Sequence, residues 1–344
     1  MAKQSPRYRF SVEECDVEDR ESLHQFRMKL DEWLRLMNED DNSVVTQLQE
    51  LLWTFNVFNS INETRRAEFE AGGSSSALNS VIADFMDRGF VLGMATGIRK
   101  LWERGHSNED KQIVSLRRVL DDVNAHAHLI SRENYVCYDG LPFSNLDDFL
   151  IDKNTSFNKV NDFQAAAEYH RLDTRGPNAS FMASLMHKSF DQISNFDPTS
   201  AHHARKDRID PDIFGRLTTH VNDSGIEKLK IYTDKILVHA GDRKSRDVAY
   251  SEVGKKISIG GFKDCIKALY EASAFLGSNI LGDSDPGGFT TAQFNVFEKL
   301  EFPWCAKERH NIPSEAWESF ANEVSNWDSF RDKYCHPPRL TKGA

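Results

Sequence analysis

The chain has 344 residues, 39% of them hydrophobic and 28% charged, which is globular composition and excludes a disordered or collagen-like protein. Its length allows one large domain or two ordinary ones. The 43 basic and 53 acidic residues give a formal net charge of −10. This balance argues against a protein coated in positive charge for non-specific duplex binding, although it leaves room for a local basic patch.

The cysteines and the N-terminus indicate the compartment. Five cysteines are scattered along the chain without a CxxC spacing, so neither a disulfide framework nor a zinc ribbon is expected. The N-terminus carries no apolar segment of the signal-peptide type, and no window approaches the roughly 18 apolar residues of a membrane span. We therefore expect a protein of the reducing cytoplasm that has no membrane partner.

Apolar residues recur at helical spacing over much of the chain. Residues 21–37 and 44–70 show this pattern, the second as a stripe along about seven turns. A connector at 72–76 leads to a further long pattern at 76–103, which predicts an antiparallel helix pair. Residues 112–130 form another amphipathic pattern. Three glycines lie at four-residue spacing within 76–103 and would let another helix approach closely: Gly89, Gly93 and Gly97.

The second half of the chain is less regular. Residues 139–225 predict an irregular insertion with helices at 161–173 and 178–190. Helical periodicity returns at 225–240 and again at 259–281, and the remainder to 344 is rich in loops and aromatic residues. Strand-like alternation is scarce apart from a possible edge pair at 248–258. The sequence therefore predicts a mainly α-helical protein.

The common catalytic signatures are absent: no GxGxxG, GxxxxGK[ST], HExxH, GxSxG or EF-hand loop occurs. Asp122 and His126 lie four residues apart and could share a metal ion with His128, but no spacing specifies a third ligand. A solvated helix face is the better explanation of that pair, and we expect neither metal nor cofactor. The basic stretch 202–208 could contact phosphate or be a solvated loop.

The most informative segment is 226–246. On a helix, Lys235 and His239 are neighbours one turn apart, with Tyr232 and Asp242 a further turn to either side. A histidine in the last turn of a helix meets the negative end of the helix dipole, which favours its protonated form. Six cations make this the most basic neighbourhood of the chain: Lys228, Lys230, Lys235, Arg243, Lys244 and Arg246.

Such a group of residues suits the handling of phosphate. A histidine supplies an acid or base, and the cations neutralise charge that develops on a transferring phosphoryl group. The alternative is that His239 packs at a helix end and bonds a carbonyl or a carboxylate.

At these residues the chain resembles a known family. The run Tyr-Thr-Asp-Lys-Ile-Leu-Val-His-Ala-Gly-Asp at 232–242 is similar to the second half of the HEPN domain, in its abortive-infection branch. There, a pattern of the form Arg-Asp-Lys-x-x-x-His-Ala ends the third helix. Residues 97–103 and 114–120 resemble the same branch, so that the likeness covers roughly 44–130 and 225–282.

The resemblance implies a HEPN-like four-helix up-down bundle that forms a homodimer through the motif-bearing helices. It divides the chain into five segments: an N-terminal helical arm (1–43), the first half of the bundle (44–138), an insertion (139–224), the second half of the bundle (225–282) and a C-terminal extension (283–344).

The resemblance further implies a metal-independent endoribonuclease of the bacterial defence or toxin type, in which the histidine assists attack of the ribose 2′-hydroxyl on the adjacent phosphate. His239 matches that histidine, and Asp234 and Lys235 match the two positions after the family arginine. Thr233 occupies the position of the arginine itself, and Lys235 cannot reproduce its bidentate fork. The expected RNA-binding residues are Tyr232, Lys230, Arg243, Lys244 and Arg246. The alternative that Thr233 leaves open is a catalytically inactive helical interaction module.

Overall fold

The computed structural model describes residues 7–71, 80–106, 108, 112–144, 177–195, 203–238, 242–254, 257–282, 292, 295–298, 307–309 and 311–327. These residues are mainly α-helical, which confirms the predicted fold class. Within the described ranges β pairing is limited to two isolated bridges, Ser131 with Arg208 and Ser194 with Ile209. The connector at 72–76 and the helix at 161–173 that the sequence predicts lie outside the described residues.

The chain divides into two compact units, each assembled from separate stretches. Unit 1 comprises Met1–Trp33, Asp122–Phe214 and Cys335–Ala344, and unit 2 comprises Leu34–Asp121 and Gly215–Tyr334. The HEPN-like division into five segments remains a prediction.

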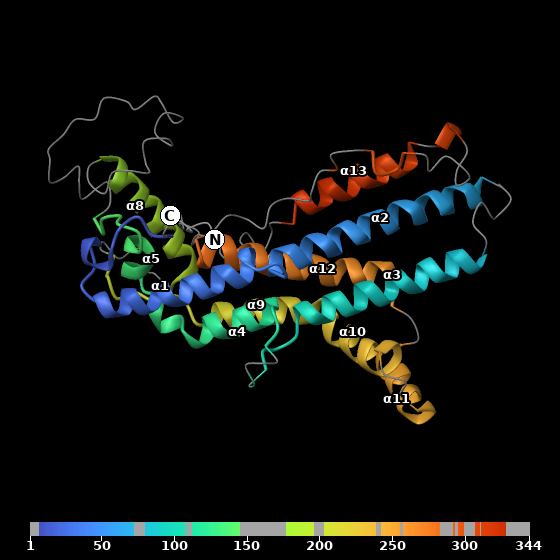
Figure 1. Ribbon diagram of the computed structural model, residues 1–344, viewed down its shortest axis with the longest axis horizontal. Helices are drawn as coiled ribbons and strands as arrows, with labels where there is room; N and C mark the ends of the chain where they lie inside the picture. Colours follow the sequence, from blue (N-terminus) through green and yellow to red (C-terminus); the bar gives the residue numbers. More distant parts are fainter. Residues whose placement is uncertain are drawn as a thin grey trace, which may run out of the picture. The chain divides into compact units, whose positions relative to one another are not determined.

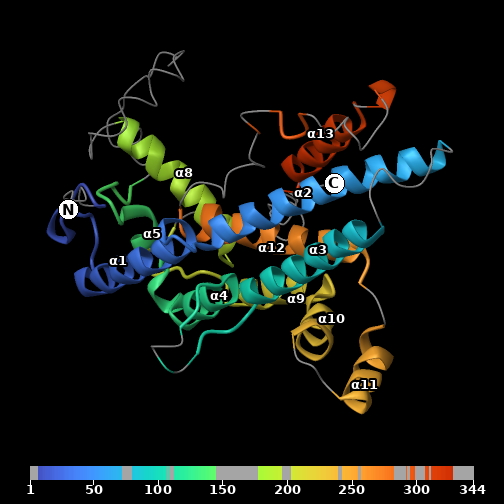
Figure 2. The same cartoon turned by 45° about the vertical axis from the view of Figure 1, so that its right-hand side comes forward.

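Unit 1 is built from short elements around two neighbouring helices. It holds η1 (Val12–Glu14), nearly all of α1 (Arg20–Leu34), η4 (Ala127–Leu129), α5 (Arg132–Cys137) and α8 (Pro177–Ile193). Helix α8 confirms the helix predicted at 178–190. Helices α5 and α8 lie side by side (Figures 1 and 2), and the rings of Tyr135 and Phe190 pack with their centroids 5.4 Å apart.

Residues 7–19 are tied to the rest of unit 1 by side-chain contacts, although the polar sequence of 1–20 predicts a loosely attached arm. Arg9 donates to Asp139 from both its backbone N–H and its side-chain Nε, at 2.8 Å each. Arg27 donates to the carbonyl of Tyr138 at 2.8 Å and lies 4.4 Å from the ring centroid of Tyr8. For residues 7–19 the loose-arm prediction was wrong, because their partners are distant in the sequence.

Unit 2 contains the long helices. Its elements are η2 (Arg35–Glu39), α2 (Val44–Glu70), α3 (Ser80–Leu101), α10 (Ile226–Tyr232), η5 (Thr233–Val238), α11 (Arg243–Val253), α12 (Ile259–Phe275), η6 (Leu276–Ile280), η7 (Lys307–Arg309) and α13 (Ile312–Ser325). Helices α4 (Leu116–Ala125) and α9 (Asp212–Asp223) have residues in both units. Ser43 caps the longest helix, α2, by accepting a hydrogen bond from the backbone of Thr46.

An aromatic core joins α2, α3, α12 and α13, which lie alongside one another in Figure 1. The rings of Phe58 and Phe90 stack at 3.7 Å, and Phe262 meets Phe90 edge-on at 5.8 Å. On the α13 side, Phe55 packs on Phe320 at 5.0 Å. Burial of such large apolar rings is the main source of stability for a helix bundle, because each removes apolar area from water.

The three spaced glycines of α3 behave differently from one another. A Cβ added at Gly97 would lie 2.7 Å from the Leu51 side chain, so α2 approaches α3 closely at that point, as the sequence predicts. Gly89 and Gly93 have nothing within 4 Å of such an atom. They belong to a face of α3 that no described neighbour packs against this closely.

Helices α9 and α11 also differ from the sequence expectations. Helix α9 occupies part of the expected irregular insertion, with Ile213, Leu217 and Val221 fully buried at four-residue spacing. Helix α11 replaces most of the possible edge pair at 248–258, and it ends at Gly254, whose φ is 85°. Among the described residues, no helix combines the length and the apolar character needed to cross a membrane.

Candidate functional site

The candidate site of the sequence falls on α10, η5 and α11. Figure 2 shows α10 against α3, with α11 further out. Helix α10 follows Gly225, which has a φ of 89°, and α11 starts after Asp242, whose carboxylate accepts a 2.7 Å hydrogen bond from the backbone of Ser245. The chain is therefore helical on both sides of the expected motif.

The α-helix changes to a π-helix at Thr233. The fully buried Thr233 hydroxyl donates to the carbonyl of Leu229 at 2.7 Å, and the Thr233 N–H is shared between the carbonyls of Leu229 and Lys230. Such competition for one carbonyl weakens the α-helical pattern, and the π-helix η5 follows directly. The sequence predicts a continuous α-helix here, whereas Thr233–Val238 is a π-helix.

The described part of this helix ends at Val238. His239, Ala240 and Gly241 lie outside the described residues. The predicted acid–base role of His239 therefore stays a prediction.

Asp234 is joined to the neighbouring helix α3. Its carboxylate lies 2.5 Å from Nε of Arg99, and Nη1 of Arg99 also donates to Glu103 at 2.9 Å. An arginine thus lies beside the residue that follows Thr233, although it comes from a distant part of the sequence. This pairing is invisible to a motif search, because Arg99 and Asp234 are far apart along the chain.

Tyr232 is packed rather than presented to solvent. Only 9% of the residue is exposed. Burial raises the pKa of its phenol, and the neighbouring Tyr250 raises it further. Tyr232 therefore leaves little ring surface on which an RNA base could stack.

The expected cations are mostly at the surface. Lys235, Arg243, Lys244 and Arg246 are exposed. Lys230 pairs with Glu227 at 3.1 Å on its own helix, and Arg243 lies 3.8 Å from Asp247. Exposed pairs of this kind contribute little and exchange readily for other partners. The surface of η5 and α11 can therefore neutralise phosphate charge.

The alternative metal site does not form a ligand set. The carboxylate of Asp122 accepts hydrogen bonds from Trp33 at 2.6 Å and Lys29 at 3.1 Å. Burial opposes ionisation of this carboxyl group, but the two donors outweigh it and lower its pKa. His126 bonds the backbone carbonyl of Asp122 at 2.9 Å and His128 is exposed. Throughout the described ranges, no three His, Cys, Asp or Glu side chains are grouped for a metal.

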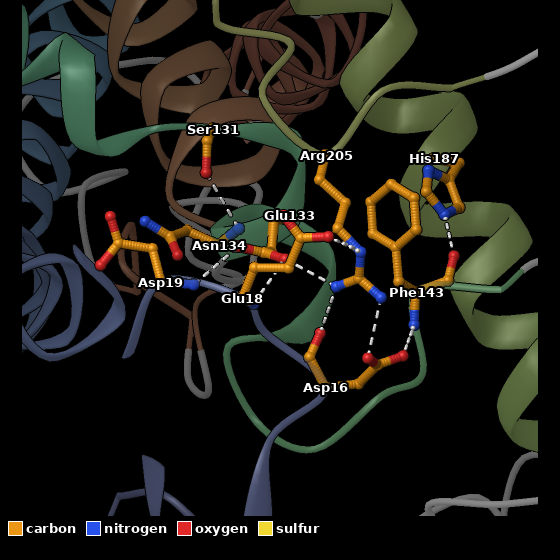
Figure 3. Close-up of polar contacts among 9 residues, drawn as sticks. All are labelled: Asp16, Glu18, Asp19, Ser131, Glu133, Asn134, Phe143, His187 and Arg205. Atoms are coloured by element: carbon orange, nitrogen blue, oxygen red, sulfur yellow. Dashed lines mark hydrogen bonds and ion pairs between the residues drawn. The ribbon is translucent and has the colours of Figure 1, made fainter. Parts of the chain in front are cut away.

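Unit 1 contains a charged cluster that was not predicted from the sequence. Figure 3 shows Glu133, at the start of α5, accepting from Nη1 of Arg205 at 2.6 Å and from the backbone N–H of Glu18 at 2.9 Å. Arg205 also donates to the Asp16 carboxylate at 2.8 Å. The basic stretch 202–208 was expected to be a solvated loop. From His203 onward, Arg205 instead binds it to Glu133 and Asp16. No sequence signal could have found this cluster, because it joins three distant segments.

Buried Arg132 extends the anchored region. Its guanidinium lies 2.7 Å from Asp191 and 2.8 Å from Asp207. Nearby, His187 donates from Nε2 to the carbonyl of Phe143 at 2.7 Å and stacks on His203 with ring centroids 4.7 Å apart. Burial lowers the pKa of His187 to about 4. A histidine that stays neutral and carbonyl-bonded near pH 7 has a structural role here.

The ion pairs of Arg132 and Arg205 join separate segments of unit 1, whereas the cations of η5 and α11 in unit 2 are exposed. No family model, no curated protein and no solved structure matches the chain.

Proposed function

We propose that this chain is a HEPN-like RNA-binding protein of the cytoplasm, whose site is formed by α10, η5 and α11. In the proposal, His239 is the acid–base group of a metal-independent endoribonuclease of the bacterial defence type. The observation that carries it is the 2.5 Å contact between Arg99 and Asp234. This contact supports the proposal because it brings the guanidinium of Arg99 beside the motif, in which Thr233 stands at the position of the family arginine.

The surroundings of this pair support the proposal. Lys235, Lys244 and Arg246 are exposed close to it in the chain. Cations of this kind supply the salt-dependent, sequence-independent part of RNA affinity. The free thiols of Cys15, Cys137 and Cys265 agree with a reducing compartment.

A second candidate function is a catalytically inactive interaction module. The ion pairs of Arg99 favour this candidate, because its guanidinium contacts the carboxylates of both Asp234 and Glu103. A guanidinium already neutralised by two carboxylates must leave one of them before it can stabilise a phosphorane-like transition state.

Cleavage of RNA in EDTA distinguishes the two candidates. The wild type is compared with His239→Ala and with a control, His24→Ala, which removes an exposed histidine from α1. A ribonuclease of this type yields cyclic-phosphate and 5′-hydroxyl ends with the wild type and the control, and none with His239→Ala. Equal cleavage by all three proteins would reject His239 as the acid–base group.

Binding is tested separately from cleavage. Lys244→Gln combined with Arg246→Gln removes two charges from α11, and Arg20→Gln with Lys188→Gln removes two exposed charges elsewhere. For single-stranded RNA, the first pair is expected to reduce the salt dependence of log K by about 1.4, because each phosphate contact contributes roughly 0.7. If both pairs bind RNA like the wild type, the α11 surface is not the RNA site.

A further inference from the structure

Arg99 lies between two carboxylates that come from different parts of unit 2. Its Nε is 2.5 Å from the carboxylate of Asp234 on η5, and its Nη1 donates to the carboxylate of Glu103 at 2.9 Å. Glu103 follows Arg99 by four positions and lies just past the C-terminal end of α3. Two acidic side chains therefore bind different nitrogens of one guanidinium.

The two sides of the Arg99 guanidinium differ in accessibility. Nε is buried and meets Asp234 as an ion pair without the alignment of a hydrogen bond. The side chain of Glu103 is 43% exposed, and a surface pair between residues one turn apart contributes little and exchanges partners readily. A phosphate can therefore reach the guanidinium only at its terminal nitrogens, where Glu103 binds.

The backbone of Glu103 is fixed, whereas its carboxylate is free to turn. Ser115, fully buried just before α4, donates to the carbonyl of Glu103 at 2.6 Å. This hydrogen bond keeps the residue beside Arg99. Lys100 is exposed three positions earlier and offers the carboxylate a second partner. Release of Arg99 therefore requires rotation of one side chain and no movement of a helix.

The neighbours of Glu103 in the chain suit an incoming phosphate. Lys100 precedes it, and Arg104 follows it with a side chain that is 75% exposed and lies 3.9 Å from Asp121. An oxygen of a phosphate group makes the same charge-assisted hydrogen bond to a guanidinium as a carboxylate oxygen does. A phosphate at this place would contact Arg99 and meet exposed cations on both sides.

We propose that Glu103 occupies the phosphate position of Arg99 and thereby inhibits the RNA site, until a phosphate of the RNA displaces its carboxylate. Asp234 keeps its contact and positions the guanidinium. This inference rests on the proposed function and names a residue that regulates the same site.

Glu103→Gln in the full-length chain tests the inhibition. It is expected to tighten the binding of single-stranded RNA about fivefold, which corresponds to the repulsion of two like charges ~4 Å apart in water. The control is Glu63→Gln on α2, which changes the net charge equally and removes a surface pair with Arg66 at 2.7 Å. We expect this control to bind like the wild type. In an Arg99→Gln background, Glu103→Gln should have no effect, because it acts through the guanidinium.

Labelling with phenylglyoxal, which modifies accessible guanidinium groups, measures the state of Arg99 without RNA. Mass spectrometry of the labelled peptide gives the rate at this residue. Glu103→Gln is expected to raise the rate about two- to fivefold, as for loss of an exposed pair, and Glu63→Gln is expected to leave it unchanged. Inorganic phosphate should protect Arg99 more strongly in Glu103→Gln than in the wild type.

The outcomes separate this inference from the proposed function. Equal RNA affinity of the wild type, Glu103→Gln and Glu63→Gln overturns the inference and leaves the RNA site in place. Tighter binding that persists in the Arg99→Gln background also overturns it, because the effect is then one of net charge. If neither the wild type nor Glu103→Gln binds RNA, the proposed function fails. The labelling then decides the phosphate position: protection of Arg99 by phosphate supports it, and no protection overturns it.

Discussion

The carboxylate of Glu133 accepts a 2.6 Å hydrogen bond from Arg205, which lies 72 positions later in the chain. The same carboxylate accepts from the backbone N–H of Glu18 at 2.9 Å. One buried carboxylate therefore joins three segments that the sequence keeps far apart.

Glu133→Gln should destabilise unit 1. The amide keeps the shape of the side chain and can still accept a hydrogen bond, but it removes the negative charge closest to Arg205, so that Asp16 alone is paired with the guanidinium at 2.8 Å. We expect a cost of about 1–3 kcal/mol. Urea unfolding followed by circular dichroism measures the change. The control is Glu18→Gln, whose carboxylate lies 3.7 Å from Arg205 and is 66% exposed, for which we expect less than about 0.5 kcal/mol. Equal losses for both variants would contradict the assigned role of Glu133.

The protein should become less stable as the pH is lowered, because His187 is protonated more easily in the unfolded chain than in the folded protein. Its folded pKa of about 4 lies below the ordinary value of 6.5, so the unfolded chain binds the proton first as the pH falls. The neutral form therefore stabilises the fold above pH 6.5, and this contribution is lost as the pH falls toward 4.

Between pH 7 and pH 5 the His187 contribution amounts to about 2 kcal/mol. His187→Gln keeps a donor for the carbonyl of Phe143 and does not titrate. Urea unfolding at the two pH values should show a drop that is smaller by that amount in the variant. An identical drop in both proteins would show that His187 does not titrate on unfolding.

Gly140 should be less replaceable than Gly225, although both have a φ of 89°. A Cβ at Gly140 would collide with the ring of Phe10, whereas Gly225 has nothing within 4 Å. Alanine at Gly225 is expected to cost about 1 kcal/mol of backbone strain, and alanine at Gly140 roughly 1–3 kcal/mol more. Thermal unfolding of both variants measures the difference. Similar losses would show that Phe10 moves aside at little cost.

The buried thiols should be inert in the folded protein. Burial raises the pKa of Cys265 to about 11 and that of Cys137 further, so at pH 8 about one Cys265 thiol in a thousand is ionised. In a Cys305→Ser, Cys335→Ser background, the thiol reagent DTNB should react only after denaturant is added. Rapid modification without denaturant would contradict the burial of these cysteines.

The sequence predicted the helical class because long helices carry their own signal. The stripe of α2 and the pattern at 259–281 follow from apolar residues at three- and four-residue steps. Helix α9 was missed because the polar residues around it outweighed the short series Ile213, Leu217 and Val221. Its four-residue spacing was nevertheless present in the sequence.

The candidate site was predictable only in part. The exposed cations of η5 and α11 could be read as a basic neighbourhood because they are close in sequence. The Arg99 contact of Asp234 could not, since it depends on how α3 packs. The π-helix at Thr233 could not be predicted from the sequence either. A threonine hydroxyl can face solvent or donate to the preceding turn of the helix, and only the packing around it decides between the two.

The interleaving of the two units has a consequence for synthesis on the ribosome. Arg205 bonds Asp16, which is 189 positions earlier. At 5–20 residues per second, the N-terminal segment waits roughly 10–40 s for this partner to be made. Until its own partners are made, α1 exposes an apolar stripe that includes Leu23, Phe26 and Leu30, all buried in the finished protein. A chaperone that shields apolar segments would therefore stay bound longest at the N-terminal end of the chain, because this end is translated first and completes its contacts late.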